Sequence, residues 1–454
     1  MKSYRILSFC MILLIACGFL SCEKFLDAKP DDRLAVPSTI TDLQLLLDDY
    51  NTLNTQYPYA QELAADNFYL TTDDWNTLSQ LDRDIYNWQK DDQTLDRWTA
   101  AYQAVLNTNI VLDNIGGVQH SVSEQAAWNN VKGSALFFRA FYFYGIAQVF
   151  TLPYNKSNPS ANPGIPLRLN ADYTEVSVRA SQEETYQQII TDLQQAISLL
   201  PVIPAIKSRP CKPAAYGLLA RVYLDMQEYA QAGAYADSCL QLYNRLIDYN
   251  TLDPAADVPI MRFSDEVIFE ALAPVFDIAT SLCRIDTLLY AAYTGNDLRR
   301  QIYFSNNTGF IVFKGDYSGL GTTVSNINIF TGIVTDEMYL VKAECNARAA
   351  NTAAAMQALN ALLLTRWKTG TFVPLTATGP ADALQKILTE RRKELLFRGA
   401  RWSDLRRLKD DPQFSVTPVR ILDGQRYELT PNSPRYALQL PRSVIEKTGM
   451  PQNP

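Results

Sequence analysis

The segment from Ser123 to Phe150 constrains the fold more than any other part of the sequence. Its second half reads LFFRAFYFYGIAQVF, so large apolar side chains occupy every side of a helix built from these residues. A surface helix carries one apolar stripe, whereas a helix that is apolar all round must be covered by other elements. We therefore predict a helix over residues 123–150 that is buried on most sides within a mainly helical protein.

Helical periodicity extends through much of the chain. From Leu95 to Ile115 large side chains recur every three or four residues, and the pair Gly116-Gly117 then ends the pattern. Another helix is predicted over residues 181–200, because Ser181 opens a capping arrangement with the acids that follow it and a proline follows Leu200. Four prolines between residues 153 and 166 indicate an extended crossover, since proline lacks a backbone donor.

Two stretches have the spacing of a tetratricopeptide hairpin, in which small residues let paired helices approach closely. The first stretch lies within residues 213–243 and places its large and small side chains at Tyr216, Leu219, Ala220, Tyr223, Ala232, Ala236 and Cys239. In the second, Ala343 and Ala355 follow Tyr339 and repeat the step that separates Ala220 from Ala232. Two hairpins in one register indicate a repeat, with ordinary helical hairpins as the alternative.

Two segments lack a helical stripe. Residues 50–88 mix Tyr, Trp, Asn, Asp and Thr, and residues 252–333 consist of short β-branched, aromatic and glycine-rich runs such as GFIVFKG. We expect irregular structure in both, with a few strands in the second. Irregular segments carried on a rigid scaffold are where binding residues usually lie.

Charge and histidine content exclude several classes of protein. The net charge is −7 and the pI is about 5.0, with no basic block, which argues against nucleic acid as a partner. A site with two or more His ligands is excluded because His120 is the only histidine, and any Ser/His/Asp triad would have to use it. GDYSGLGTTV lacks the third glycine and the lysine of a phosphate loop. We therefore predict neither a metal, nor a cofactor, nor catalytic residues.

The N-terminus has the pattern of an export signal. Lys2 and Arg5 precede an apolar run that ends in small residues before Cys22, and the run is too short for a confident membrane span. A lipidated cysteine would anchor the chain by acyl groups; Cys17 is a second candidate, and a simple cleaved signal is the alternative. Loss of residues 1–21 removes Lys2 and Arg5 and takes the net charge from −7 to −9.

The remaining cysteines are scattered, with no CxxC and no regular spacing, so they do not form a disulfide framework. We interpret them as small core residues: Cys211, Cys239, Cys283 and Cys345.

Aromatic residues are abundant, with 25 Tyr, 19 Phe and 6 Trp. Most must pack in the core, but those in the irregular segments, including Tyr69 and Trp75, are interleaved with Asn, Asp and Thr. Flat rings beside polar groups suit sugar recognition, because the C–H face of a sugar stacks on the ring while its hydroxyls bond to amides and carboxylates. For any single ring, packing is the alternative.

Five motifs follow one another along the chain. They are CEKFLDAKP at 22–30, the W-xxx-Y-xx-V-xx-TN-xx-L series at 98–112, KGSALFFRAFYFYGIAQVF with NPGIPL at 132–167, ERRKELLFRGARWSDLRRL at 390–408 and the ending at 436–454. In this order they resemble the SusD/RagB family of outer-membrane nutrient-binding lipoproteins. CEKFLDAKP resembles the mature start of that family and favours Cys22 as the lipidated residue. Two positions depart from the family pattern, namely Thr151, often Gly, and Arg398, often Glu.

The 390–408 motif can also be interpreted from its residues alone, independently of the resemblance. We interpret the motif as a structural, amphipathic helix pair in which Glu394 and Asp404 form salt bridges with neighbouring arginines.

The resemblance implies a mostly α protein with four tetratricopeptide-like hairpins, irregular loop-rich inserts and a few short strands. Such proteins form a lid on a SusC-like, TonB-dependent outer-membrane transporter, capture an oligosaccharide and break no bond. They lie at the cell surface, here lipid-anchored at Cys22. In relatives the ligand contacts come from the irregular N-terminal segment and the central insert, and the matching positions here are Asp66, Asn67, Trp75, Trp88, Tyr303 and Tyr317.

The expected organisation is a signal peptide and one SusD-like domain. The parts are the signal peptide at 1–21 and the domain at 22–454, with an irregular segment at about 50–90, helical hairpins at about 91–250 and 334–408, an irregular insert at about 252–333 and an extended C-terminal segment at 409–454. Three other functions remain open: an oligopeptide binder of the RagB type, a surface glycan hydrolase and a secreted helical-repeat scaffold without a small ligand.

Overall fold

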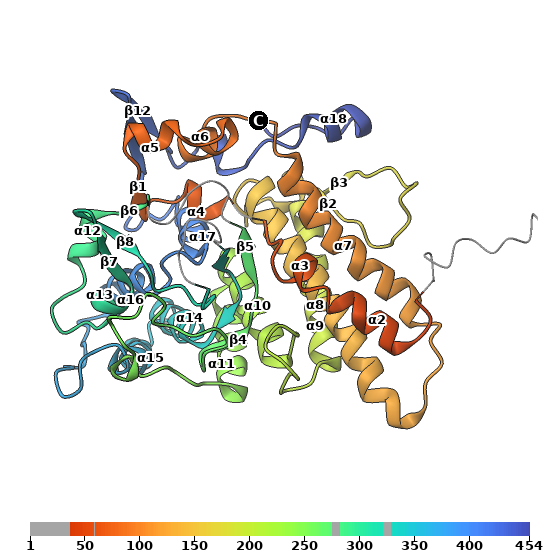
Figure 1. Cartoon of the computed structure of the whole chain (residues 1–454), viewed down its shortest axis with the longest axis horizontal. Helices are drawn as coiled ribbons and strands as arrows, with labels where there is room; N and C mark the ends of the chain where they lie inside the picture. The colour runs from red at the N-terminus through yellow and green to blue at the C-terminus, as the bar shows by residue number, and fades with distance from the viewer. Residues whose placement is uncertain (1–36, 59, 275–281, 321–327) are drawn as a thin grey trace, which may run out of the picture. The chain divides into compact units, whose positions relative to one another are not determined.

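The computed structural model describes residues 37–58, 60–274, 282–320 and 328–454 (Figure 1). Residues Thr39–Pro454 form one compact unit. The predicted signal peptide and Cys22 lie outside the described residues. Over the described ranges, no helix combines the length and the apolar character that a membrane crossing requires.

Eight helices follow one another in a stack, each packed against the next (Figure 1). They are α7 (Leu95–Ile115), α8 (Gln125–Phe150), α9 (Gln182–Leu199), α10 (Lys212–Asp225), α11 (Tyr229–Leu242), α14 (Thr335–Arg348), α15 (Thr352–Leu364) and α16 (Pro380–Glu394). The predicted mostly helical fold is confirmed.

Helix α8 is the centre of the core, as its composition predicts. Every residue from Gly133 to Phe150 is buried. The one charge in the apolar run, Arg139, is neutralised by Asp192 of α9, whose two carboxylate oxygens each lie 2.8 Å from a guanidinium nitrogen. A buried charge requires such pairing, because transfer out of water is costly. The neighbouring helix therefore supplies both apolar cover and a counter-charge.

Local signals set the helix ends where they were expected. Ser181 and Glu184 form a capping box at the start of α9: the Glu184 N–H donates to Ser181 Oγ over 3.1 Å, and the Ser181 N–H donates to Glu184 Oε2 over 2.8 Å. Helix α7 ends at Ile115, directly before the glycine pair. The proline-rich crossover contains β2 (Pro163–Pro166), which pairs with β3 (Arg179–Ser181).

Small residues bring the hairpin helices together, as the repeat spacing predicts. Ala220, Ala232, Ala343 and Ala355 are all fully buried. Helices α11 and α14 approach so closely at Gly233 that an added Cβ would lie 2.9 Å from Cβ of Cys345. The four cysteines of the described chain are buried and free, which agrees with a packing role.

The N-terminal segment is more regular than predicted. Its elements are α2 (Ile40–Leu47), α3 (Tyr50–Leu53), α4 (Gln61–Ala64), β1 (Phe68–Tyr69), α5 (Thr72–Asn76) and α6 (Gln80–Tyr86). The side chains of Asp49, Thr71 and Ser79 cap three of these helices by accepting a backbone N–H. The prediction relied on an apolar stripe along each helix. Helices of this length are too short to display one.

The central insert contains short strands, as predicted, and two short helices. They are β4 (Val267–Phe269), β5 (Leu272–Pro274), β6 (Arg284–Ile285), α12 (Thr287–Ala291), α13 (Arg299–Ile302), β7 (Phe304–Asn307), β8 (Phe310–Phe313), β9 (Asn328–Phe330) and β10 (Ile333–Val334). Strand β6 pairs with β1, which joins the insert to the N-terminal segment.

The C-terminal segment is less extended than predicted. After α17 (Ala400–Arg407) it forms the hairpin of β11 (Val419–Leu422) and β12 (Gln425–Glu428), and then α18 (Arg442–Thr448). The tight turn at Asp423 and Gly424, where both residues have positive φ, closes the hairpin.

A buried cluster of ion pairs links the insert to the helical stack. The Glu394 carboxylate accepts from Arg366 Nε over 2.7 Å and from Arg299 Nη1 over 2.8 Å. Arg366 Nη2 also donates to Glu266 Oε1 over 2.6 Å, and all four side chains are fully buried. The 390–408 motif is thus built into the protein interior.

The predicted salt bridges of this motif are confirmed for one acid and wrong for the other. Asp404 pairs with its neighbours Arg391 and Arg407, at 3.0 and 2.8 Å. The partners of Glu394 come from distant segments instead, because its carboxylate lies in the interior where the insert meets the stack.

The cluster makes stability sensitive to the loss of a single cation. Arg366→Ala leaves Glu266 and Glu394 buried without this partner, so we expect the free energy of unfolding to fall by about 3–5 kcal/mol. Urea denaturation followed by circular dichroism measures the change. Lys368→Ala, at an exposed position two residues away, is the control and should stay within about 0.5 kcal/mol of the parent protein. An equally small effect of Arg366→Ala would contradict the structural role of the cluster.

Candidate functional site

The pairing of β1 with β6 brings residues from the N-terminal segment and the insert to one surface. Tyr69 lies directly opposite Arg284 in the antiparallel register, so their side chains share one side of the pair. Tyr69 is 43% exposed. On the other side, Phe68 and Ile285 point into the core and are buried. Successive side chains of a strand point to opposite sides, so the Phe68 ring is buried and the Tyr69 ring faces solvent.

Arg284 connects three elements on this surface. Its guanidinium carbon lies 4.1 Å from the centroid of the Phe310 ring at the start of β8, and it forms an ion pair with Asp74 of α5. Partial burial opposes ionisation of Asp74, but hydrogen bonds from Thr71 and Arg284 prevail and lower its pKa. The carboxylate is therefore charged and held in place.

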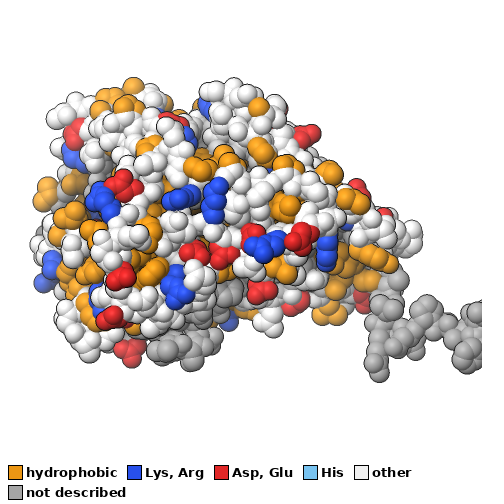
Figure 2. Space-filling view, turned by 90° about the horizontal axis from the view of Figure 1, so that it is seen from above, with side chains coloured by type: hydrophobic (Ala, Val, Ile, Leu, Met, Phe, Trp, Pro, Cys, Tyr) orange, Lys and Arg blue, Asp and Glu red, His pale blue; other side chains and the backbone are white. Residues whose placement is uncertain are grey.

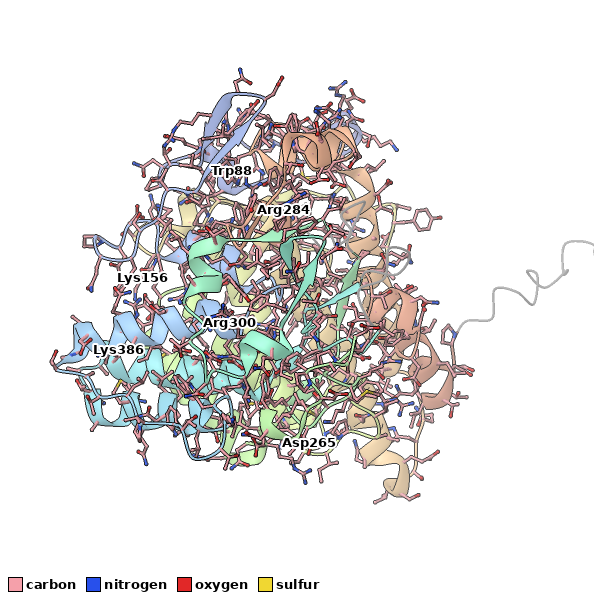
Figure 3. The ribbon with its side chains drawn as sticks, turned by 60° about the vertical axis from the view of Figure 1, so that its left-hand side comes forward. Trp88, Lys156, Asp265, Arg284, Arg300 and Lys386 are labelled. Carbon is pink, nitrogen blue, oxygen red and sulfur yellow. The ribbon has the colours of Figure 1, made fainter. Side chains whose placement is uncertain are left out.

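Trp75 follows Asp74 on α5. Its ring is half-buried, its indole N–H donates to the Arg83 carbonyl over 3.3 Å, and the Arg83 guanidinium carbon lies 5.8 Å from the ring centroid. We call Tyr69, Asp74, Trp75, Arg284 and Phe310 the ring-and-arginine face. Figure 3 shows Arg284 beside the strands of the insert.

A similar pair lies elsewhere on the insert. The exposed Arg300 covers the half-buried Tyr290 ring, with its guanidinium carbon 4.7 Å from the ring centroid, and its Nε donates to the Tyr290 hydroxyl over 3.3 Å. Guanidinium groups that stack on rings keep in-plane N–H donors free for a ligand. Rings, donors and a fixed carboxylate on one surface are the groups that bind polyhydroxylated molecules.

Asp66 and Asn67, two of the predicted ligand residues, hold the N-terminal segment against the stack. The Asp66 carboxylate accepts from Arg401 Nη2 of α17 over 2.8 Å, and its side chain is 19% exposed. Asn67 is fully buried and donates to Glu62 Oε1 over 2.8 Å. Asp66 keeps a small exposed edge, whereas Asn67 has no surface to offer.

Trp88, Tyr303 and Tyr317 also lie in the interior. Trp88 is 2% exposed and donates its indole N–H to the Ala64 carbonyl over 2.9 Å. The two tyrosines are each 1% exposed, and both hydroxyls lie 3.0 Å from that of Tyr249. A ring enclosed on both faces cannot stack on a sugar, so we correct the role of these three side chains to packing. Of the predicted rings, Trp75 alone keeps an open surface.

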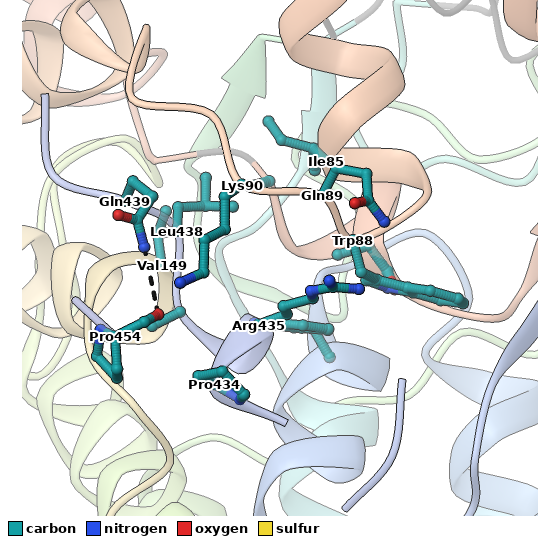
Figure 4. Close-up of a pocket in the computed structure, with 14 residues that line it drawn as sticks. Ile85, Trp88, Gln89, Lys90, Val149, Pro434, Arg435, Leu438, Gln439 and Pro454 are labelled. Atoms are coloured by element: carbon teal, nitrogen blue, oxygen red, sulfur yellow. Dashed lines mark hydrogen bonds between the residues drawn. The ribbon is translucent and has the colours of Figure 1, made fainter. Parts of the chain in front are cut away.

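A small pocket beside Trp88 does not change this conclusion. Lys90, Arg435 and Pro454 lie around it, and Gln439 donates to the Pro454 carbonyl over 3.5 Å (Figure 4). Its volume is about 20 Å³. Such a space holds about one water molecule and is too small for a sugar ring.

Sequence reasoning missed Arg284 and Phe310. Phe310 follows Thr308 and Gly309, both of which have positive φ and form the turn between β7 and β8. A ring directly after such a turn stands at a hairpin tip and is a candidate for exposure. Nothing local marks Arg284, since its role depends on pairing with Tyr69. Within the described residues, no group of three metal-ligating side chains occurs.

The fold is a stack of helices whose irregular segments carry rings and fixed polar groups. Two family models match this chain. The one described as "Starch-binding associating with outer membrane" matches residues 24–224, and the SusD family model matches residues 290–446. The two matches together span most of the chain, which therefore belongs to the SusD/RagB family.

Individual relatives agree with this assignment. The SusD-like protein P2 of Formosa agariphila is 23% identical over 420 residues, which cover 79% of each chain. A SusD superfamily protein of Bacteroides thetaiotaomicron is 21% identical, with a TM-score of 0.73 over 92% of this chain and 100% of that one. The surface glycan-binding protein A of Bacteroides uniformis is 17% identical, with a TM-score of 0.69 over 91% and 99%. These likenesses show the shared fold.

Glu62, beneath the Asp66 segment, makes stability depend on pH. Burial raises its pKa to about 7, although its carboxylate accepts from Asn67 and from the Gly399 N–H. The folded state therefore binds the proton more tightly than the unfolded chain, and this contribution to stability is lost as the pH rises from about 4.5 to 7.

Glu62→Gln keeps this side chain neutral at every pH. We expect the free energy of unfolding of the variant, relative to the parent protein, to rise by about 1–3 kcal/mol between pH 5 and pH 8. Urea denaturation at the two pH values measures it, with Glu446→Gln, at an exposed position, as control. A constant difference between variant and parent would contradict the prediction.

Proposed function

We propose that this protein is a non-catalytic, cell-surface nutrient-binding lipoprotein. It captures an oligosaccharide on the ring-and-arginine face and delivers it to a SusC-like, TonB-dependent transporter in the outer membrane. Family membership supports the ligand class. The observation that carries the proposal is the exposed Tyr69 ring opposite Arg284, whose guanidinium pairs with Asp74, with the half-buried Trp75 next to Asp74 on α5.

The chemistry of the face suits binding better than bond cleavage. A glycosidase needs one carboxyl group that stays protonated to act as an acid, opposite a second carboxylate. Asp74 has the opposite character, because its ion pair with Arg284 favours the charged form. His120 stacks on Trp128, with 5.3 Å between ring centroids, and bonds to Gln125 and the Val118 carbonyl. Asp74 and His120 are thus both engaged in contacts with their neighbours.

Charge distribution also favours a sugar over a polyanion such as nucleic acid. On the surface drawn in Figure 2, Lys and Arg side chains are interspersed with Asp and Glu. A protein that follows a phosphate backbone needs a continuous basic stripe. A mixed surface with half-exposed rings suits a ligand held by stacking and by single hydrogen bonds.

Trp75 should contribute directly to ligand binding. We expect Trp75→Ala to weaken binding of the preferred oligosaccharide about tenfold, since ring stacking contributes up to about 1.5 kcal/mol. Isothermal titration of the mature protein with oligosaccharide and oligopeptide mixtures measures this. If the variant bound as well as the parent protein, the assigned face would be wrong; a response to peptides alone would favour a peptide binder.

A matched control is available in Trp128→Ala. Trp128 is also half-buried and donates its indole N–H to a backbone carbonyl, that of Ile115, over 2.9 Å. It lies at the start of α8 and shares no element with the ring-and-arginine face. This variant should bind as the parent protein does, which separates ligand contact from general loss of a tryptophan.

Cys22 is the proposed site of lipidation. The acyl chains would hold the protein at the membrane. A single acyl chain binds a membrane only weakly, so stable anchoring needs a second chain or a second membrane-binding feature. We expect Cys22→Ser to move the protein from the membrane fraction to the soluble fraction of the cells, whereas Cys17→Ser should leave it in the membrane fraction. Immunoblots of the two fractions test this. Release by Cys17→Ser instead would assign the anchor to Cys17.

A further inference from the structure

A ring-lined groove lies on elements that take no part in the ring-and-arginine face. It runs between α7, the loop from Pro166 to Val178 and α18, and has a volume of about 330 Å³. Three aromatic side chains line it: Trp98, Tyr102 and Tyr173. This volume is at the lower end of the range for ligand pockets, about 300–1,000 Å³, which suits one or two sugar rings.

The floor of the groove is fixed by the core. Trp98 is 7% exposed, lies 4.7 Å from Tyr102 and meets Phe150 of α8 edge-on at 5.1 Å, centroid to centroid. The Tyr102 hydroxyl donates to the Pro166 carbonyl over 2.8 Å. The floor therefore keeps its shape without a ligand.

The loop that forms the wall is also held in place. Arg168 donates to the Glu175 carbonyl over 2.6 Å and to Ser177 Oγ over 3.3 Å, which closes the loop on itself. Asn109 of α7 donates to the carbonyls of Arg168 and Asn170, over 2.8 and 3.0 Å. A binding loop fixed in advance loses little conformational entropy when a ligand arrives.

This fixed loop carries an exposed aromatic side chain, Tyr173. Tyr173 is 92% exposed, although the loop that carries it is hydrogen-bonded to α7 at Pro166 and Arg168 and closed on itself by Arg168. Its neighbours Val176 and Val178 are 68% and 70% exposed. An apolar group kept in solvent on a fixed element is a feature of interaction sites. Tyr173 is the outer ring of the groove, and Trp98 and Tyr102 are its floor.

The geometry points to a second carbohydrate subsite in this groove, for a neutral mono- or disaccharide unit that stacks between Tyr173 and the floor. Three charged side chains line the groove: Arg168, Glu175 and Lys447. The Arg168 guanidinium is bonded within its own loop and lies 4.0 Å from the Glu175 carboxylate. Asn170, Ser177 and Thr448 offer neutral hydrogen-bonding groups. Rings with a mixed polar rim suit hydroxyl groups.

A peptide that binds by adding a strand to an exposed sheet edge suits the groove less well. The lining residues come mainly from α7, α18 and the loop. Pro166, which strand β2 supplies, has no N–H to donate. The inference rests on the proposed function, because it names sugars as ligands, and extends it by a second contact for the same chain. Two subsites would bind a long glycan more tightly than either site alone.

Titration calorimetry of the mature protein tests the proposal, with maltohexaose, xylohexaose and mannohexaose as neutral probes, oligogalacturonate as an acidic probe and tetra-alanine as a peptide probe. The variants are Tyr173→Ala, Trp75→Ala and, as a matched control in the same loop, Val176→Ala, which does not line the groove. All three change surface side chains, and thermal unfolding checks that each variant folds.

We expect a neutral hexaose to show two binding events with the parent protein and with Val176→Ala. Tyr173→Ala should lose one event and keep the other, and Trp75→Ala should show the reverse. For the corresponding polysaccharide, either single variant should weaken binding at least about tenfold through lost avidity.

The contrary outcomes are distinct. If Tyr173→Ala bound with unchanged stoichiometry and affinity while Trp75→Ala lost all binding, the second subsite would be refuted and the proposed function would stand. Binding of oligogalacturonate or tetra-alanine, but of no neutral probe, at the groove would refute the ligand class. Absence of binding of every sugar to the parent protein would overturn both proposals.

Discussion

The buried contacts of Glu394 with Arg366 and Arg299 are the constraint on which the rest of the molecule depends. Glu394 ends the last long helix of the stack, Arg299 lies in the insert, and Arg366 follows α15 and reaches Glu266 beside β4. Removing these charges from water is costly, so the pairs are tolerated only when every partner is present. The insert therefore adopts its position when its ionic partners in the helical stack are in place.

The departure at Arg398 fits into the same system. Its guanidinium pairs with Asp336 over 2.6 Å and lies 3.8 Å from the centroid of the Tyr317 ring. Burial raises the pKa of Asp336 to about 7, even with Arg398 beside it. A cation at this position thus covers an aromatic ring and offsets an acid in the interior, which explains why Tyr317 is structural. The 390–408 motif, distinctive in the sequence, is a scaffold motif.

The sequence predicted those parts of the fold that depend on local patterns. The aromatic run of α8, the cap at Ser181 and the alanine spacing of the hairpins each have a signal within a few residues. The ligand residues were predicted less well, because burial of a ring in an irregular segment depends on distant packing. Trp88 is enclosed under Arg420, more than three hundred residues later in the chain, whereas Trp75 remains open. Nothing in the neighbouring sequence distinguishes these two tryptophans.

The contact between Asp74 and Arg284 spans 210 residues of chain. Synthesis proceeds from the N-terminus, so Tyr69 and Trp75 exist long before the strand that completes their surface. The helices in between can already stack on one another, since each contacts its neighbour in order. A truncated chain that stops before the insert would thus contain stacked helices but lack a complete recognition surface.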